Sequence, residues 1–215
     1  MALEPLELAD WRRRVAELYA AWRAQAASDP ERATREFRAA RDGLFREHPQ
    51  SPLPAAQRAG YEGVPYFEYD PAYLMTAELE PLPADPGGAQ SPIALPSSTD
   101  APFAFQRVGR VQLGGPLAGA SLSVFWIGGY GGGLFLPFRD ATSGAQTYAA
   151  GRYLLDTIKG ADLGGDDRRL VVDLNFAYHP SCAYDPRWSC PLAPEGNRLA
   201  APVPAGEQLP PGGWT

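Results

Sequence analysis

The chain has few of the residues that most often carry chemistry: two Cys, two His and two Met in 215 residues. It has no apolar run as long as a membrane span, and its N-terminus has no apolar segment of signal-peptide type. We therefore expect a cytoplasmic protein without a membrane partner. In that compartment Cys182 and Cys190 would be reduced unless their surroundings protect a disulfide.

Standard catalytic and nucleotide-binding motifs are also missing. The sequence contains no Gly-x-Ser-x-Gly elbow, no His-Glu-x-x-His pair and no Walker-type loop. The glycine-rich run 128–133 precedes a strand-like segment, 134–138, whereas a phosphate-binding loop needs a helix directly after it. The run therefore predicts a hairpin turn. His48, between Glu47 and Pro49, is interpreted as a loop residue.

The net charge of −6 argues against a general nucleic-acid binder, which needs a cationic surface. A hydrophobic fraction of 45% and a charged fraction of 20% are typical of an ordinary globular protein. Arg residues in the first 60 positions alternate with Glu and Asp. This pattern predicts a solvated, ion-paired helical face, and an arm that binds an anion or a partner is the alternative.

The N-terminal part has helical periodicity. Apolar and aromatic residues recur between Leu8 and Trp22 at helical spacing, which predicts a core-facing stripe. Asp29 followed by Pro30 predicts the N-cap and first position of a second helix. We expect that helix to end near Gly43, because three prolines follow within 45–54.

From Tyr61 onward the pattern is that of short strands separated by turns, in keeping with 23 Gly and 23 Pro. The segment 81–102, dominated by Pro, Gly, Ser and Ala, predicts a long surface loop. We predict a mostly β protein, an antiparallel β-barrel or β-sandwich with N-terminal helices packed on it. Residues 1–60 would form a helical arm, and 61–215 one β-domain. The strands are expected at 64–69, 73–79, 103–113, 121–127, 134–138, 148–157 and 169–178.

Two of these strands have a polar face. Alternation in 170–178 places Asp173 and Asn175 opposite the apolar residues. If this strand pairs with 151–156, Arg152 would lie near Asp173 or Asn175. An ordinary solvent-exposed sheet surface is one interpretation. A cleft or barrel lumen, in which an Arg–Asp pair orients a polar ligand, is the other.

The segment 178–191 gathers both cysteines, His179, three aromatic residues and three prolines. A metal site of His179, Cys182, Cys190 and Asp185 has no standard zinc spacing to support it. A Cys182 nucleophile with His179 as base would need a third orienting group and an oxyanion site. A Cys182–Cys190 disulfide has a plausible loop length but suits another compartment. Buried thiols packed under the loop are the remaining interpretation.

Long, specific motifs recur along the chain: HPQSPL (48–53), YF (66–67), LPFRDATSG (136–144), TY (147–148), GRYL (151–154), DLNFAY (173–178), PSCAYD (180–185), CPL (190–192), EGNRL (195–199) and AGE (205–207). Together they resemble an uncharacterised prokaryotic family catalogued as domain of unknown function 1684. The resemblance spans nearly the whole chain and implies a location for a site, not an activity. His179 stands where the family pattern usually has Asn, which weakens its case as an essential base or metal ligand. Ala149 and Ala150 replace a frequent Gly-Gly.

The leading hypothesis is a site for a small polar or anionic molecule, without cofactor or metal. The residues expected to converge there are Arg139, Asp140, Tyr148, Arg152, Asp173, Asn175, Tyr178, Tyr184, Asp185, Glu195 and Asn197. The first alternative is a hydrolase or isomerase with Asp173 or Asp185 as base and Arg152 as anion clamp. The second is a structural or interaction domain. In that case Arg152 would form a bridge to Asp173, and Asn197 would cap a turn.

Overall fold

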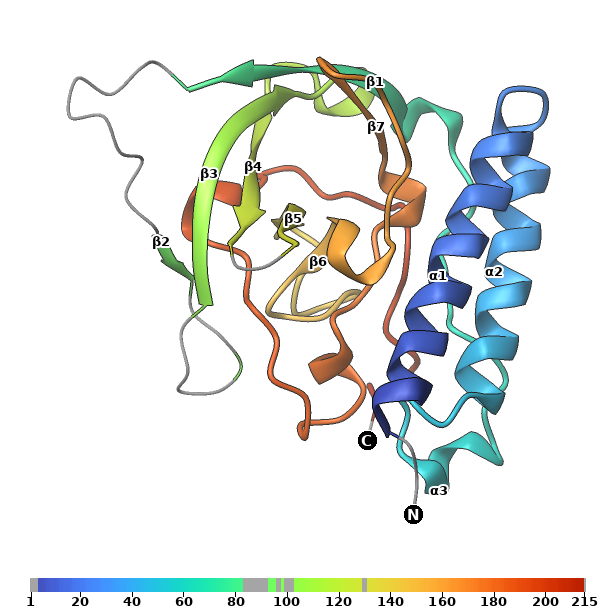
Figure 1. Ribbon diagram of the computed structural model, residues 1–215. Coiled ribbons are helices and arrows are strands. Elements are labelled where there is room, and N and C mark those ends of the chain that lie inside the picture. The colour runs from blue at the N-terminus through green and yellow to red at the C-terminus, as the bar shows by residue number, and fades with distance from the viewer. Residues whose placement is uncertain (1–3, 83–92, 96–97, 99–102, 129–130, 215) are drawn as a thin grey trace.

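The computed structural model describes residues 4–82, 93–95, 98, 103–128 and 131–214 of the chain. Two long helices lie side by side along one side of a curled antiparallel sheet (Figure 1). No described helix is both long and apolar enough to cross a bilayer. The helices are α1 (Glu4–Ala26), α2 (Pro30–Glu47) and the short α3 (Ala55–Arg58).

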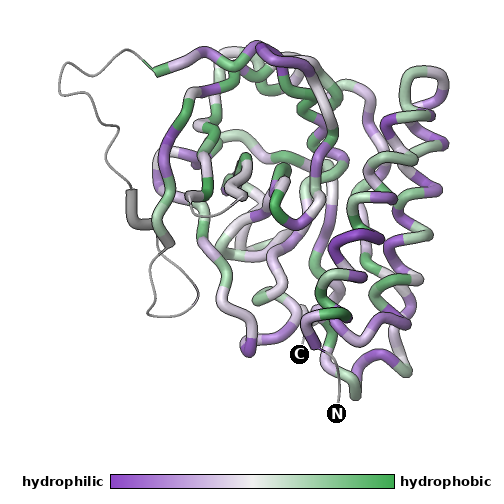
Figure 2. Tube along the Cα trace, in the orientation of Figure 1, coloured by the Kyte–Doolittle hydropathy of each residue, from purple (hydrophilic) through white to green (hydrophobic). Residues whose placement is uncertain are grey.

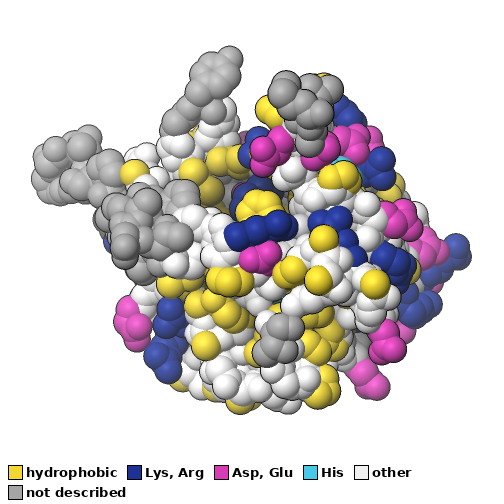
Figure 3. Space-filling view, turned by 90° about the horizontal axis from the view of Figure 1, so that it is seen from below, with side chains coloured by type: hydrophobic (Ala, Val, Ile, Leu, Met, Phe, Trp, Pro, Cys, Tyr) yellow, Lys and Arg dark blue, Asp and Glu magenta, His cyan; other side chains and the backbone are white. Residues whose placement is uncertain are grey.

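The first turns of α2 follow the sequence closely. The Asp29 carboxylate accepts a hydrogen bond from the Arg32 backbone N–H at 3.0 Å, which confirms the predicted N-cap. Exposed ion pairs join Arg32 to Glu36 and Arg35 to Glu31, each at 2.8 Å. Charges of both signs intermingle over the helices in Figure 3. This confirms the solvated, ion-paired face, where each pair adds about 0.5 kcal/mol.

The predicted end of α2 near Gly43 is wrong, because the helix continues to Glu47. Gly43 lies inside the helix, where glycine costs about 1 kcal/mol relative to alanine. Leu44 and Phe45 are both buried in the next turn. Burying two such side chains is worth about 3 to 6 kcal/mol, which exceeds the cost of the glycine.

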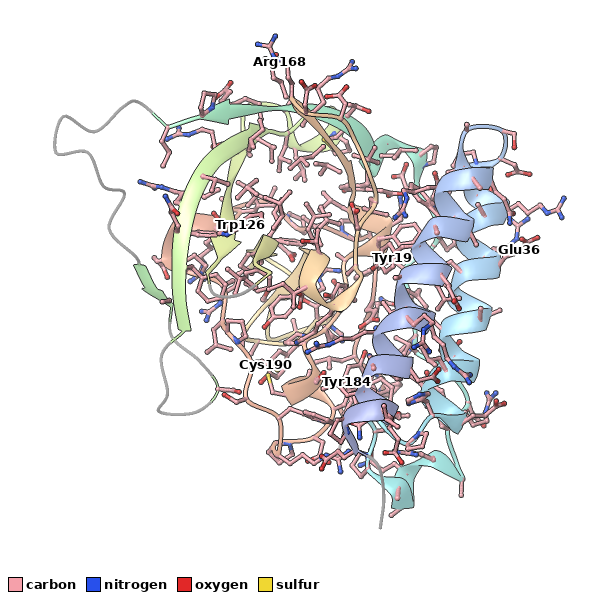
Figure 4. The ribbon with its side chains drawn as sticks, viewed as in Figure 1. Tyr19, Glu36, Trp126, Arg168, Tyr184 and Cys190 are labelled. Atoms are coloured by element: carbon pink, nitrogen blue, oxygen red, sulfur yellow. The ribbon has the colours of Figure 1, made fainter. Side chains whose placement is uncertain are left out.

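One aromatic cluster attaches both helices to the sheet. Phe176, just after the last strand, packs against Trp22 on α1 at a ring distance of 4.8 Å and against Phe37 on α2 at 4.7 Å. Tyr19 contacts both Phe37 and Phe176 and points from α1 toward the sheet in Figure 4, whereas Glu36 points outward. The core-facing stripe predicted for α1 is therefore confirmed.

The sheet has the strand order β6-β5-β4-β3-β1-β7, and the short β2 pairs with β3. Every strand pair is antiparallel. The strands carry both hydrophobic and hydrophilic positions (Figure 2), and β5 and β6 are buried at nearly every position. The mostly β class with helices packed on it is thus confirmed, in the form of a half-barrel. The strands are β1 (Leu74–Pro81), β2 (Ile93–Leu95), β3 (Phe103–Gln112), β4 (Ser121–Ile127), β5 (Gly133–Phe138), β6 (Arg152–Asp156) and β7 (Arg169–Asp173).

The edge strands β6 and β7 do not pair with each other as strands. The pairing of 151–156 with 170–178 that the sequence left open does not form over most of its length, because the 3-10 turn Leu174–Phe176 interrupts the chain after Asp173. Only Tyr153 and Tyr178 meet, each donating its backbone N–H to the other's carbonyl, at 2.8 and 2.9 Å. One residue pair therefore joins the half-barrel across its open side.

Other boundaries also differ from the sequence pattern. The segment 64–69 is not a strand, since Tyr66 forms only an isolated bridge with Glu207. The strand β2 lies inside the predicted surface loop 81–102, most of whose other residues lie outside the described part of the chain. Antiparallel pairing of β4 with β5 agrees with the predicted hairpin, although 129–130 are not among the described residues.

The strand β6 begins at Arg152 and not at Tyr148 as predicted, because a turn precedes it. Gly151 has φ +100°, and a Cβ there would lie 2.4 Å from the Phe138 carbonyl oxygen. Only glycine fits both conditions. The backbone can therefore turn tightly before Arg152 and bring that side chain into the interior.

Candidate functional site

Arg152, at the start of β6, is completely buried and bonded on several sides. Its Nη2 donates to the Asp140 carboxylate and to the Val203 carbonyl, both at 2.9 Å. Its Nη1 donates to the carbonyls of Ala205 and, at 3.3 Å, Glu207. Burial lowers the pKa of Arg152, and the Asp140 charge opposes that shift. Arg152 therefore fastens the C-terminal segment to the sheet.

The partner carboxylate of Arg152 is equally occupied. Asp140 Oδ1 accepts hydrogen bonds from the backbone N–H and the hydroxyl of Thr142, at 2.8 and 2.6 Å, and from the Val203 N–H at 3.1 Å. The neighbouring Arg139 donates from Nε to the Ala150 carbonyl at 3.2 Å. These side chains order the loop after β5, and their contacts are all with protein groups.

Arg152 does not pair with Asp173 or Asn175, the neighbours considered for it if the two strands paired, because its carboxylate partner is Asp140. Asp173 Oδ1 accepts from the N–H and the Nδ2 of Asn175, at 3.0 and 2.8 Å. Asn175 also bonds the backbone of Asp70 in both directions, at 3.0 and 2.9 Å. Asp173 Oδ2 has no hydrogen-bond partner among the described residues, and burial raises the pKa of Asp173 to about 6.

A second buried ion pair joins α2 to the C-terminal segment. Glu207 is fully buried, and its Oε2 accepts from the Tyr184 hydroxyl at 2.6 Å and from the His179 backbone N–H at 2.7 Å. Arg41 Nη1 pairs with Glu207 Oε1 and donates to the Tyr66 hydroxyl at 3.0 Å. This cluster contains Tyr184 from the predicted site, together with charges that the sequence pattern did not single out.

His179 is buried beside this cluster as a neutral imidazole. Its Nε2 accepts the Tyr148 backbone N–H at 3.2 Å, so its proton resides on Nδ1. Nδ1 lies 3.5 Å from Glu207 Oε2, too far for a good hydrogen bond. Burial lowers the pKa of His179 to about 3, and nearby guanidinium charges lower it further. His179 is therefore not arranged as a base for Cys182.

Both cysteines are free and buried. The Cys182 backbone N–H donates to Cys190 Sγ at 3.3 Å, and the Tyr148 hydroxyl lies 3.8 Å from Cys182 Sγ. Among the described residues, no group of three or more His, Cys, Asp and Glu side chains could hold a metal ion. Of the four interpretations of this loop, packed thiols describe the present state.

The remaining candidates have local roles. Asp185 accepts from the Arg187 backbone N–H at 2.9 Å and pairs with its Nε at 3.1 Å. The Glu195 side chain is 83% exposed. Asn197 is fully buried and donates from Nδ2 to carbonyls on β4 and β5, at 2.8 and 2.7 Å, while its Oδ1 accepts a β4 N–H at 2.9 Å. Asn197 thus bridges two strands and does not cap a turn.

A cavity of about 80 Å³ lies between α1, α2 and the segment 178–184. Of the predicted site residues only Tyr178 and Tyr184 line it, so the predicted set does not converge on one pocket. A larger depression of about 910 Å³ between α1 and α2 is lined by exposed groups such as the Asp10–Arg14 ion pair. The aromatic walls of the smaller cavity are Trp11, Tyr19, Phe37, Phe45, Tyr153, Tyr178 and Tyr184.

Arg41 is the functional candidate that the sequence pattern missed, because it was counted with the solvated arginines of the helical arm. The helical spacing of its neighbours in the sequence could have identified Arg41. Phe37, Arg41 and Phe45 follow one another at intervals of four residues and share one face of α2. An arginine between two buried aromatic residues on one face is placed at the interface with the sheet. Its partner Glu207 was part of the AGE motif but had no assigned role.

Comparison with known proteins adds the family. The model of a family described as proteins of unknown function, DUF1684, matches residues 59–208. The chain belongs to the DUF1684 family. The matched DUF1684 segment includes Arg152 and Glu207, whereas Arg41 lies in the helix before it. No curated protein matches the chain.

The DUF1684 fold also has a solved counterpart. The solution structure of an uncharacterized protein of Haloarcula marismortui is 30% identical and superposes with a TM-score of 0.58, covering 86% of this chain and 96% of that chain. Neither the family nor this structure has an assigned activity. The chemistry of the site therefore has to be inferred from its residues.

Proposed function

We propose that this DUF1684 protein binds a small carboxylate-bearing molecule in the cavity between its helices and its half-barrel, with Arg41 as the anchor. The observation that carries the proposal is the state of the Arg41 guanidinium. It lines an aromatic cavity, is held in place by a fully buried carboxylate, and still has donors to spare.

Arg41 uses only one of its three guanidinium nitrogens for protein contacts. Nη1 serves both Glu207 and Tyr66, whereas Nε and Nη2 donate to no other group in the described part of the chain. The Arg41 side chain keeps 13% of its exposure, against none for Glu207. Its guanidinium also lies 4.3 Å from the Phe45 ring centroid, which fixes its plane. Two free donors on a planar, immobile group suit a carboxylate.

The matched contrast is Arg38, one turn earlier on α2. Arg38 donates to the Phe67 carbonyl and the Asn175 carbonyl, both at 3.1 Å, and does not line the cavity. Arg38 uses both terminal nitrogens for backbone carbonyls, and its Nε has no partner among the described residues. Of the two arginines, Arg41 is the one that lines the aromatic cavity.

The size of the cavity limits the ligand. About 80 Å³ accommodates roughly five to eight water-sized groups, which corresponds to a short-chain carboxylate. The aromatic walls would cover its apolar part. Lys159 lies at the rim, where its half-exposed ammonium pairs with Asp156 at 3.5 Å. A carboxylate entering there would meet positive charge first and apolar surface second.

The hydrolase or isomerase hypothesis loses its proposed parts in this geometry. Arg152, the intended anion clamp, bonds only protein groups and has no exposure. Asp173 and Asp185, the intended bases, do not line the cavity. A binding function needs none of these residues and agrees better with the placement of Arg41.

The test uses propionate and butyrate as probes, with propionamide and butyramide as neutral isosteres, in NMR titrations of the ¹⁵N-labelled full chain. A ligand of about five non-hydrogen atoms can reach a Kd of about 1 mM without exceeding known ligand efficiencies. We expect the acids to shift cavity amides, such as those of Arg41 and Tyr178, and the amides to bind at least tenfold more weakly. Equal binding of acids and amides would refute the role of Arg41.

Variants make the test specific. Glu207→Gln removes the carboxylate that competes for Arg41 and should tighten propionate binding severalfold. Adding Arg41→Met to Glu207→Gln avoids a buried unpaired charge and should abolish binding. Arg35→Met, which makes the same charge change on the exposed face of α2, is the control and should bind as the wild type does.

A further inference from the structure

The two cysteines are the reactive groups that the proposed binding function leaves unused. We propose that Cys182 and Cys190 form a redox-active dithiol that a hydroperoxide converts into an intramolecular disulfide, with Cys182 as the attacking sulfur. The proposal is independent of carboxylate binding. It rests on how the two sulfurs, Tyr148 and the intervening loop are arranged.

The two cysteines are neighbours before any oxidation. The Cys182 backbone N–H donates a hydrogen bond to Cys190 Sγ at 3.3 Å. They are the only two cysteines of the chain. The 3-10 turn Ser181–Ala183 holds one sulfur, and hydrogen bonds to Ser98 hold the backbone next to the other, with Cys190 N donating to the Ser98 hydroxyl at 2.9 Å. Bond formation would therefore require only a short movement within one loop.

The two sulfurs are not equivalent. Cys182 retains 9% of its exposure and Cys190 only 1%, so an oxidant reaches Cys182 first. The Tyr148 hydroxyl also lies 3.8 Å from Cys182 Sγ. The neighbouring Cys190 side chain and the Tyr148 hydroxyl stabilise a negative sulfur and lower the pKa of Cys182. The thiolate is the nucleophile in peroxide chemistry, so Cys182 is the attacking residue.

The chemistry balances in two steps. The Cys182 thiolate attacks the terminal hydroxyl oxygen of a hydroperoxide, which forms an S–O bond and breaks the O–O bond. The leaving oxygen takes a proton and departs as an alcohol or as water. The Cys190 thiol then attacks the Cys182 sulfenic acid, forming the S–S bond and releasing water. Two thiols and one hydroperoxide give one disulfide, one alcohol and one water. A low-molecular-weight dithiol would reverse the reaction by exchange.

The pKa of Cys190, the thiol that attacks in the second step, depends on the oxidation state of Cys182. While Cys182 is a thiolate, its nearby negative charge raises the pKa of Cys190. Oxidation makes Cys182 a neutral sulfenic acid, and this restraint disappears. Cys190 can then lose its proton as it attacks, so the second step follows from the first.

The experiment treats the full chain with one equivalent of hydrogen peroxide and follows intact mass and peptide maps. We expect the loss of two hydrogens and a Cys182–Cys190 cross-link, with a rate at least tenfold above that of free cysteine. Cys190→Ser should stop at a sulfenic acid that dimedone traps. Cys182→Ser should react at least tenfold more slowly than the wild type. Circular dichroism establishes that each variant is folded.

Tyr148→Phe leaves both thiols in place and tests the hydroxyl separately. It should slow the peroxide reaction severalfold and shift the pH profile of Cys182 alkylation upward, because one stabilising hydroxyl is lost. Equal rates for Cys182→Ser and wild type, or a wild-type rate no faster than free cysteine, would overturn the proposal. So would accumulation of sulfinic acid without any disulfide.

Discussion

Arg152 Nη2 lies 2.9 Å from Asp140 Oδ2, and neither side chain exceeds 1% exposure. The ion pair joins two segments twelve residues apart, and the same guanidinium holds three carbonyls in the C-terminal segment. Arg152 therefore fixes the C-terminal segment, at Val203, Ala205 and Glu207, to the sheet. This role differs from that of an anion clamp, and it has a clear consequence for stability.

Replacing Arg152 should strongly destabilise the fold. Arg152→Met leaves Asp140 charged and unpaired in the interior and removes the donor from three carbonyls, so we expect a loss of about 3 to 5 kcal/mol in the free energy of unfolding. Urea denaturation followed by tryptophan fluorescence measures it. Arg168→Met, at a side chain that is 76% exposed, should change stability by less than about 0.5 kcal/mol. Similar losses in both variants would contradict the fastening role.

His179 should make the protein sensitive to mild acid. Its pKa is about 3 in the folded chain against 6.5 when unfolded, so only the unfolded chain takes up the proton between those values. His179 does not reduce the free energy of unfolding above pH 6.5. Below that pH the free energy of unfolding falls, by about 2 kcal/mol at pH 5. His179→Gln keeps an acceptor for the Tyr148 N–H and should reduce this loss. The idea fails if wild type and variant lose stability in parallel from pH 8 to pH 5.

Asp173 should act in the opposite direction. Its folded pKa is raised to about 6 from 3.8, so the unfolded chain ionises first as the pH rises. The contribution of Asp173 to the free energy of unfolding is fully present below pH 3.8 and is lost as the pH rises through 6. At pH 7 the loss is at most about 3 kcal/mol. Asp173→Asn should therefore gain stability over the wild type between pH 4 and pH 7 in chemical denaturation.

A control of opposite sign is available for that measurement. Asp166 accepts hydrogen bonds from Arg169, which lower the pKa of Asp166 to about 2, so Asp166→Asn should lose stability over the same interval. A gain for both variants would mean that general charge reduction, and not the burial of Asp173, is the cause.

Asn197 should matter far more than the exposed residue two positions before it. Asn197→Ala removes three hydrogen bonds and leaves backbone groups of β4 and β5 without a partner, which should cost about 2 to 4 kcal/mol. Glu195→Ala removes only an exposed side chain and should cost less than about 0.5 kcal/mol. Thermal unfolding of the two variants compares them, and equal midpoints would rule out the bridge between strands.

Local structure could be predicted from the sequence because its causes are local. The Asp29 N-cap, the stripe of α1 and the strand character of β3 and β4 depend on neighbours within a few positions. The end of α2 was misjudged for the same reason. Gly43 signals a helix end locally, but the burial of Leu44 and Phe45 depends on the sheet.

The candidate site was decided by contacts between distant segments. The sequence pattern placed Arg152 beside Asp173 or Asn175 if the two strands pair, yet Arg152 pairs with Asp140, and Asp173 with Asn175. The 3-10 turn Leu174–Phe176 ends β7 and leaves only the Tyr153–Tyr178 bridge to β6. Period-two alternation assumes a strand that continues, so it could not foresee this.

By itself the sequence determined the two N-terminal helices, the mostly β class of the rest, and which stretches hold the polar motifs. Only the tertiary structure decided which charges are buried together. Arg41 and Glu207 lie at opposite ends of the chain, and no short-range pattern relates them. A charge can be buried only where a partner offsets the loss of hydration, and the fold supplies that partner.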